Sequence, residues 1–209
     1  NRSFTRDLAR AFRIDADPPK QPDWNRRIEI LYDEDEICES LRVINQDSEW
    51  VAIDYETNCL KPEYPKAEIV SCAVSNGQRT ISYLWKGRVI ETTGKLLKSK
   101  RTRKIASNLK MEEKWTLAEF GHGVSCWGWD TMIAAHCLDN RPGICSIKFQ
   151  ALVKAGVPSY NDHIEPFLVG RGWYNRIRQV EVRRLLFYGG MDAILEYRIA
   201  MLQRKEMGY

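Results

Sequence analysis

The sequence predicts an α/β fold in which helices flank a mixed sheet that starts antiparallel and continues with parallel strands. Three observations support this prediction. Strand-like segments dominate the chain before residue 108, the pair Asn76-Gly77 separates two of them, and the later segments are mainly helical in pattern. An antiparallel start followed by alternating strands and helices is typical of a mixed sheet with helices packed on it.

The bulk composition fits one globular domain. Of the 209 residues, 44% are apolar and 29% are charged, which is enough for a hydrophobic core under a charged surface. No apolar run approaches the roughly 20 residues that span a bilayer. The six cysteines are scattered without a CxxC pair, which favours a reducing compartment. We therefore expect a cytoplasmic protein that makes no contact with a membrane.

The elements are expected in the following order. Residues 1–24 form an N-terminal arm and a proline-containing linker, and residues 25–209 form the compact domain. The strands are expected at residues 27–32, 50–56, 67–75, 79–85 and 104–107, and the helices at 33–45, near 92–97, and at 109–120, 131–138, 147–155 and 180–205. Asn76-Gly77 favours a type I′ hairpin turn, because both turn positions must tolerate positive φ.

The strand at residues 50–56 carries a pair of carboxylates. Residues two apart on a strand point to the same face, so Asp54 and Glu56 project together. Two adjacent carboxylates repel each other unless a proton or a cation lies between them, and oxygen ligands suit a hard divalent cation. The alternative is a strand end that emerges into solvent, where carboxylates have no such cost.

Two further motifs place polar groups at helix positions. Tyr188 and Asp192 are four residues apart and share one helical face, although Gly189 and Gly190 between them disfavour a helix. The glycines indicate either a close approach to the backbone or a helix that starts near residue 191. In that second case the tyrosine would be half-buried and the aspartate solvated.

The other motif, Asn108 to Glu112, lies where a short strand runs into a helix. Asn108 is an N-cap candidate, and acidic residues near a helix N-terminus can be purely structural. Asp130, which precedes another apolar helix, is also read as an N-cap.

The order of these motifs resembles the DEDD exonuclease superfamily, in its tyrosine-bearing branch. The stretches IDYETN (53–58), ASNLKMEEKW (106–115) and FYGGMDAILEYR (187–198) resemble its three motifs, and WDTMIAAHCLDNRPG (129–143) is similar to the helix after the second. The likeness extends from about residue 27 to residue 207. It is strongest to the proofreading domain of family-A DNA polymerases and to standalone bacteriophage exonucleases.

The resemblance implies an RNase H-like fold and a site with two Mg²⁺ or Mn²⁺ ions. Asp54 would bridge both ions, while Glu56 and Asp192 would complete the site of the ion that activates water. Tyr188 would hydrogen-bond that water, and Glu112 would act on the second ion through its water shell. The family usually has aspartate where this sequence has Glu112.

The neighbouring Glu113 is the alternative second-motif acid, but it would lie about 100° away around a helix. Asn108 and Lys110 are candidate nucleic-acid contacts. Apolar or aromatic side chains that could stack on unpaired bases are Leu60, Trp115, Tyr160 and Phe187. The three histidines have no metal-ligand spacing, which argues against zinc.

The net charge of +4 includes two basic runs, which favour an anionic partner. The first run is Lys95, Lys98, Lys100, Arg101, Arg103 and Lys104, and the second is Arg171, Arg176, Arg178, Arg183 and Arg184. The resemblance implies that this partner is DNA with a free 3′ end, preferably single-stranded, and that a replication protein is a further partner. It implies release of nucleoside 5′-monophosphates during proofreading, repair or replication, in the host cytoplasm if the chain is viral. The alternatives are an RNA 3′-end exonuclease, a non-catalytic scaffold that binds nucleic acid, and the proofreading fragment of a larger polymerase.

Overall fold

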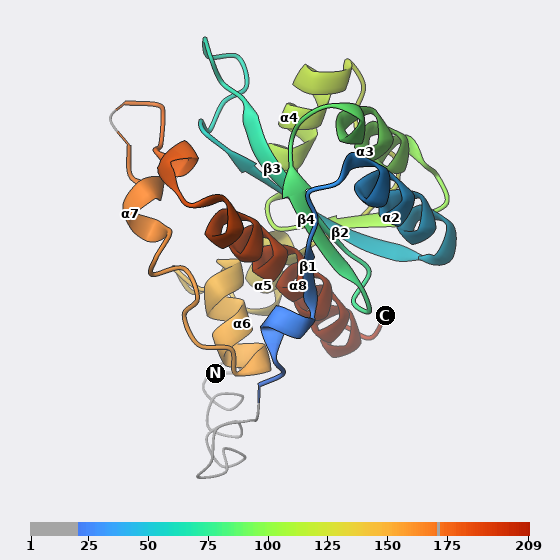
Figure 1. Ribbon diagram of the computed structural model, residues 1–209. Coiled ribbons are helices and arrows are strands. Elements are labelled where there is room, and N and C mark those ends of the chain that lie inside the picture. Colours follow the sequence, from blue (N-terminus) through green and yellow to red (C-terminus); the bar gives the residue numbers. More distant parts are fainter. Residues whose placement is uncertain (1–20, 171) are drawn as a thin grey trace.

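The computed structural model describes residues 21–170 and 172–209, which form a six-stranded sheet between two layers of helices (Figure 1). The strands are β1 (Ile28–Ile30), β2 (Trp50–Thr57), β3 (Ile69–Ser75), β4 (Thr80–Leu84), β5 (Arg103–Ala106) and β6 (Trp127–Asp130), in the spatial order β1-β4-β3-β2-β5-β6. The expected arm and linker, residues 1–24, lie largely outside the described residues.

The strand directions confirm the predicted mixed sheet. Strands β2, β3 and β4 pair antiparallel, whereas β5 is parallel to β2, β6 is parallel to β5, and β1 is parallel to β4. The strand β6 was not expected, because its four residues, WGWD, show no clear alternation. The parallel pairing brings the carboxyl ends of β2, β5 and β6 to one edge of the sheet.

The helices agree closely with the sequence pattern. They are α2 (Glu34–Asp47), α3 (Arg88–Lys98), α4 (Leu109–Phe120), α5 (Thr131–Leu138), α6 (Ile147–Ala155), α7 (Glu165–Leu168) and α8 (Val182–Glu206), together with the short 3-10 helices η1 (Trp24–Arg26) and η2 (Ile177–Gln179). The short elements α7, η1 and η2 were not expected, because three or four residues carry no readable periodicity.

The two helical layers explain why β2 is buried on both faces. Val51, Ile53 and Tyr55 enter the main core with residues of α2 and α3, whereas Ala52 packs with Ala200 of α8 on the other face. Figure 1 shows α8 crossing that second face, with α6 beside it, while α2 and α3 cover the first. Asp54 and Glu56 alternate in step with Ala52 and therefore face α8.

The hairpin between β3 and β4 exists, but its turn differs from the prediction. Ser75 pairs with Thr80, which leaves a four-residue loop, and only Gly77 of the Asn-Gly pair has positive φ (+83°). The Asn76 side chain accepts hydrogen bonds from the backbone N–H groups of Gln78 (3.1 Å) and Arg79 (2.8 Å). The type I′ prediction is therefore wrong, because the asparagine closes the turn with its side chain instead of adopting positive φ.

Helix α8 is continuous through Gly189 and Gly190, and the close-approach interpretation is confirmed at Gly190. A Cβ at position 190 would lie 2.4 Å from Cγ2 of Ile28, which is too close for two carbon atoms. A Cβ at position 189 would lie 3.5 Å from Cγ of Glu56, an ordinary contact. The glycine at 190 thus lets α8 lie directly on β1.

None of the described helices combines the length and the apolar character needed to cross a membrane. All six cysteines are free, and three of them (Cys38, Cys59 and Cys72) are buried.

Candidate active site

Three of the expected site residues converge on the α8 face of the sheet. Asp54 and Glu56 project from β2, Asp192 projects from α8, and one carboxylate oxygen from each lies within 4.8 Å of the others. Glu56 and Asp192 are buried, and Asp54 is partly buried. Asp192 is therefore not the solvated residue that a helix boundary would produce.

Asp192 is bound by two side chains that the sequence motifs did not assign to the site. The ammonium of Lys148, on α6, donates to Oδ2 at 2.6 Å, and the hydroxyl of Tyr160 donates to Oδ1. Lys148 Nζ also lies 4.9 Å from the ring centroid of Tyr188 and 5.8 Å from that of Tyr160. Lys148 is thus a cation that is paired with Asp192 and lies against both tyrosine rings.

The close packing of acids shifts their pKa values. Burial, followed by the negative charge of Asp192, raises the pKa of Asp54 to about 7, although Lys148 opposes this shift. Burial, followed by the charges of Asp54 and Asp192, raises the pKa of Glu56 well above its usual range. Lys148 alone therefore does not offset the burial and mutual repulsion that disfavour the ionised carboxylates, which is the condition that favours a bound cation.

Tyr188 lies one helical turn before Asp192 and is buried. Burial, followed by the charges of Asp192, Glu56 and Asp54, raises the pKa of its phenol far above the usual range. The hydroxyl consequently stays protonated at neutral pH, so it can act as a hydrogen-bond donor or acceptor but not as a phenolate.

The two candidate second-motif acids have different environments. Glu112, on the first turns of α4, is buried, and its Oε2 has no hydrogen-bond partner among the described residues. Burial, followed by the charge of Asp54, raises the pKa of Glu112. Glu113 instead accepts hydrogen bonds from Val124 N (2.9 Å) and Trp127 Nε1 (2.9 Å). Of these two candidates, Glu112 is therefore the one with an unpartnered carboxylate oxygen and with Asp54 as a neighbouring charge.

The start of α4 is organised by Asp130 more than by Asn108. Asn108 occupies the N-cap position in the left-handed conformation (φ 66°, ψ 55°), but its side chain makes no capping bond. Asp130 accepts from the N–H groups of Asn108 (3.1 Å) and Leu109 (3.0 Å), and it also caps its own helix α5. Asp130 is an N-cap, as expected, and serves two helices. Lys110 is exposed on the first turn of α4.

A buried acid on α8 was not expected from the sequence. Glu196 lies one helical turn after Asp192, is 2% exposed, and accepts a hydrogen bond from Ser107 N at 3.1 Å. The signal that could have found it is the spacing Tyr188, Asp192, Glu196, which places all three on one helical face. No comparable spacing pointed to Lys148 or Tyr160, because both come from segments distant in sequence.

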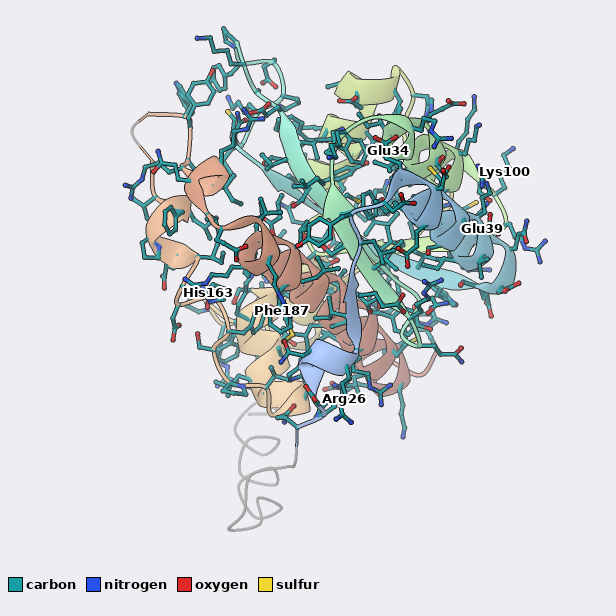
Figure 2. All side chains as sticks on the ribbon, in the orientation of Figure 1. Arg26, Glu34, Glu39, Lys100, His163 and Phe187 are labelled. Carbon is teal, nitrogen blue, oxygen red and sulfur yellow. The ribbon has the colours of Figure 1, made fainter. Side chains whose placement is uncertain are left out.

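The stacking candidates and the basic runs are dispersed. Trp115 belongs to the main core, Leu60 is exposed, and Tyr160 binds Asp192. The first basic run lies around α3 and the start of β5, beside the amino end of β2, and Figure 2 shows Lys100 at the periphery of that layer. Lys104 is buried and donates to backbone carbonyls. The first basic run therefore lies away from the carboxyl end of β2, where Asp54 and Glu56 are found.

In the second run, Arg171 lies outside the described residues. Arg178 pairs with Glu68 at 2.8 Å, and Arg176 donates to the carbonyl of Pro166 at 2.6 Å. The exposed Arg183 and Arg184 lie in the first turn of α8, where the side chain of Glu181 caps their N–H groups. The second run thus surrounds the amino end of the helix that carries Tyr188 and Asp192.

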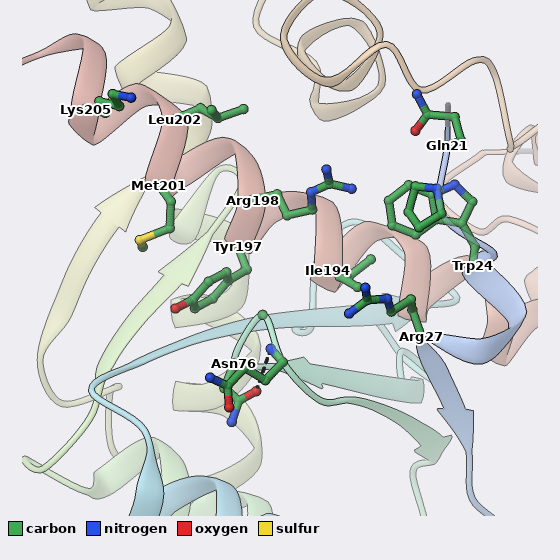
Figure 3. A pocket seen from close by; sticks show the side chains of 13 residues that line it. Gln21, Trp24, Arg27, Asn76, Ile194, Tyr197, Arg198, Met201, Leu202 and Lys205 are labelled. Carbon is green, nitrogen blue, oxygen red and sulfur yellow. Dashed lines mark hydrogen bonds between the residues drawn. The ribbon is translucent and has the colours of Figure 1, made fainter. Parts of the chain in front are cut away.

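A cavity of about 850 Å³ lies apart from the carboxylates, between η1, the β3–β4 turn and the second half of α8 (Figure 3). Trp24, Tyr197 and Arg198 are among its lining residues. Positions 194, 197, 198 and 201 are on the opposite side of α8 from Asp192, given about 100° per residue. The cavity is therefore separate from the acidic site.

The sequence matches no protein-family model and no curated protein. Solved structures with a similar fold include Brucella melitensis NrnC with bound Mg²⁺ (TM-score 0.63, 16% identity, covering 87% of this chain and 81% of NrnC). NrnC has also been solved bound to pGG. Others are Escherichia coli RNase D, an exoribonuclease (TM-score 0.64, 13% identity, 87% of this chain and 46% of RNase D), and the catalytic core of Trypanosoma brucei RRP6 (TM-score 0.63, 12% identity, 90% and 50%).

The chain has an RNase H-like fold. With identities this low, the shared property is the fold, and the expected resemblance to DEDD exonucleases is confirmed at that level. The particular likeness to bacteriophage exonucleases stays a prediction.

Proposed function

We propose that the protein is a metal-dependent 3′–5′ exonuclease, which hydrolyses phosphodiester bonds at the 3′ end of DNA and releases nucleoside 5′-monophosphates. The observation that carries this proposal is the convergence of Asp54, Glu56 and Asp192 within 4.8 Å, one helical turn from Tyr188. An oxygen-only ligand set of this kind suits Mg²⁺ or Mn²⁺ and not a thiophilic metal. The RNase H-like fold supports the same reading.

The carboxylates fit a divalent cation. Asp54 Oδ2 is buried and has no hydrogen-bond partner among the described residues, so a ligand position is available there. The raised pKa values of Asp54 and Glu56 reflect burial first and the repulsion of neighbouring acids second, and a bound cation would stabilise the ionised carboxylates against both. Asp54, Glu56 and Asp192 would hold the ions, with Glu112 acting beside them. When bound, Mg²⁺ or Mn²⁺ would supply a lower pKa for the attacking water and a positive charge opposite the phosphate.

The other residues would orient the reactants. The protonated hydroxyl of Tyr188 would hydrogen-bond the attacking water and direct it at the phosphorus atom. Lys148 would present a positive charge next to Asp192, where an entering phosphate would otherwise meet only carboxylates. Tyr160 would fix the orientation of Asp192 through its hydroxyl.

We propose single-stranded DNA as the preferred substrate, with a role in proofreading, repair or replication and a replication protein as partner. Lys110, exposed on the first turn of α4, and Asn108 at its N-cap are the proposed contacts to the nucleotide. An RNA 3′-end exonuclease is the second candidate. The likeness to Escherichia coli RNase D favours it.

The test is a digestion of single-stranded DNA labelled at its 5′ end, with a matched RNA of the same sequence. We expect a ladder of shortening DNA products with Mg²⁺ or Mn²⁺, which EDTA and Asp54→Ala abolish. Asp47→Ala, an exposed aspartate at the end of α2, is the matched control and should digest DNA normally. DNA that stays intact with both metals would refute the proposal, and faster digestion of the RNA would favour the second candidate.

A further inference from the structure

Two buried acids, Glu112 and Glu196, lie outside the group formed by Asp54, Glu56 and Asp192. Glu112 and Glu196 are 4% and 2% exposed, and each has one carboxylate oxygen, Oε2, without a hydrogen-bond partner among the described residues. A buried carboxylate oxygen without a partner loses its hydration and gains nothing in return. Two such oxygens in one region therefore require an explanation.

Glu196 and Glu112 lie on elements that meet just after β5, because Glu196 binds Ser107 N at 3.1 Å and α4, which carries Glu112, begins at Leu109. Tyr188, Asp192 and Glu196 are spaced by four residues along α8, so they line one helical face, which is turned toward β2. Burial, and then the negative charges of Asp54, Glu112 and Asp192, raise the pKa of Glu196. Burial, and then the charge of Asp54, raise the pKa of Glu112. The charge of Asp54 thus acts on both Glu112 and Glu196.

The remaining oxygen of Glu196 links it to the second motif. Its Oε1 accepts from the N–H of Ser107, which follows β5 and precedes the turn at Asn108 that begins α4. Glu196 therefore fixes the backbone that carries Glu112, while its Oε2 stays free. A purely structural acid would need only the first contact.

We propose that Glu196 is a further ligand of the bound metal, supplying Oε2 to a second divalent cation that Asp54 and Glu112 share. This inference rests on the proposed function and extends its ligand set, because neither the sequence motifs nor the group of three contains Glu196. It also gives a physical account of the glutamate at position 112. Glu112 is one methylene longer than the aspartate usual in the resembled family. Glu196, as a second acid on α8, would supplement Glu112 as a ligand.

The test is Mn²⁺ binding to the full chain, followed by the electron paramagnetic resonance signal of free Mn²⁺. We expect the wild type to bind two ions per chain, and Glu196→Gln to bind the second ion at least 10-fold more weakly while keeping the first. The melting temperature in EDTA should change little, because the glutamine oxygen still accepts from Ser107. Glu206→Gln, near the end of the same helix and paired with Lys154, is the matched control and should bind both ions normally.

Three results would overturn the inference. They are unchanged binding of two ions by Glu196→Gln, a wild type that binds only one ion, or a lower melting temperature in EDTA with unchanged Mn²⁺ affinity, which would mark Glu196 as structural. If the glutamine variant does not fold, Glu196→Asp replaces it, because it keeps the charge but shortens the reach. A weakened second ion supports the inference, and an unchanged one overturns it.

The proposed function is tested independently by the wild-type DNA ladder. A normal ladder combined with unchanged ion binding by Glu196→Gln would remove only the role of Glu196. An absent ladder would remove the function itself.

Discussion

Lys148→Met should destabilise the protein strongly in EDTA and much less in Mg²⁺. The Lys148 ammonium lies 2.6 Å from Asp192 Oδ2, and the two side chains are 30% and 5% exposed. Breaking a buried ion pair by removing one partner costs about 3–5 kcal/mol, and an exposed pair contributes about 0–1 kcal/mol. Because Lys148 is partly exposed and Tyr160 still binds Asp192, we expect about 2 kcal/mol in EDTA. For a chain of this size that corresponds to a fall of about 4–8 °C in melting temperature.

A bound divalent cation would restore the missing positive charge beside the same carboxylates, so the difference from wild type should shrink at saturating Mg²⁺. The assay is thermal unfolding followed by circular dichroism, in EDTA and in Mg²⁺. Lys154→Met is the matched control, since Lys154 is also on α6 and also pairs with α8, through Glu206. Its loss of stability should be the same in both conditions. A Lys148→Met loss that is equally independent of metal would refute the reasoning that Lys148 and the metal neutralise the same charges.

The remaining predictions concern the acids and the glycines of α8. Asp54→Asn should stabilise the protein in EDTA above pH 7 by about 2–4 kcal/mol. The reason is that the folded pKa of about 7 exceeds the usual 3.8, so wild-type stability falls as the pH rises from about 4 to 7. Urea unfolding at pH 4 and pH 8 measures this, and an equal gain at both would contradict it. Glu112→Gln should lower kcat for DNA digestion by about 10²-fold or more, comparable to the loss of one electrostatic stabiliser. Glu113→Gln should retain activity. The reverse result would make Glu113 the acid of the second motif. Gly190→Ala should lower stability by about 1–2 kcal/mol through overlap with β1, whereas Gly189→Ala, which meets only ordinary contacts, should be neutral or stabilising in the same urea titration.

Much of the fold could be predicted because its elements carry strong local signals. The bounds of α4, α5 and α6 match the expected ranges, since each has a capping residue or a glycine at an end that marks where the helix starts or stops. The alternation in β2 is sufficient by itself to put Asp54 and Glu56 on one face. The four-residue strand β6 and the turn at Asn76 were not predictable in this way, because pairing partners and side-chain hydrogen bonds decided them.

The sequence by itself determined the fold class, the paired carboxylates of β2 and the shared face of Tyr188 and Asp192, because these follow from periods of two and about four residues. Only the tertiary structure decided which groups meet across elements. It brought Lys148 of α6 to Asp192, bound Glu113 to Trp127, and buried Glu196 against Ser107. The physical reason is that local periodicity fixes the direction in which a side chain points, whereas its partners depend on how separate helices and strands pack. Burial and neighbouring charge, which set the pKa values of these acids, exist only after that packing.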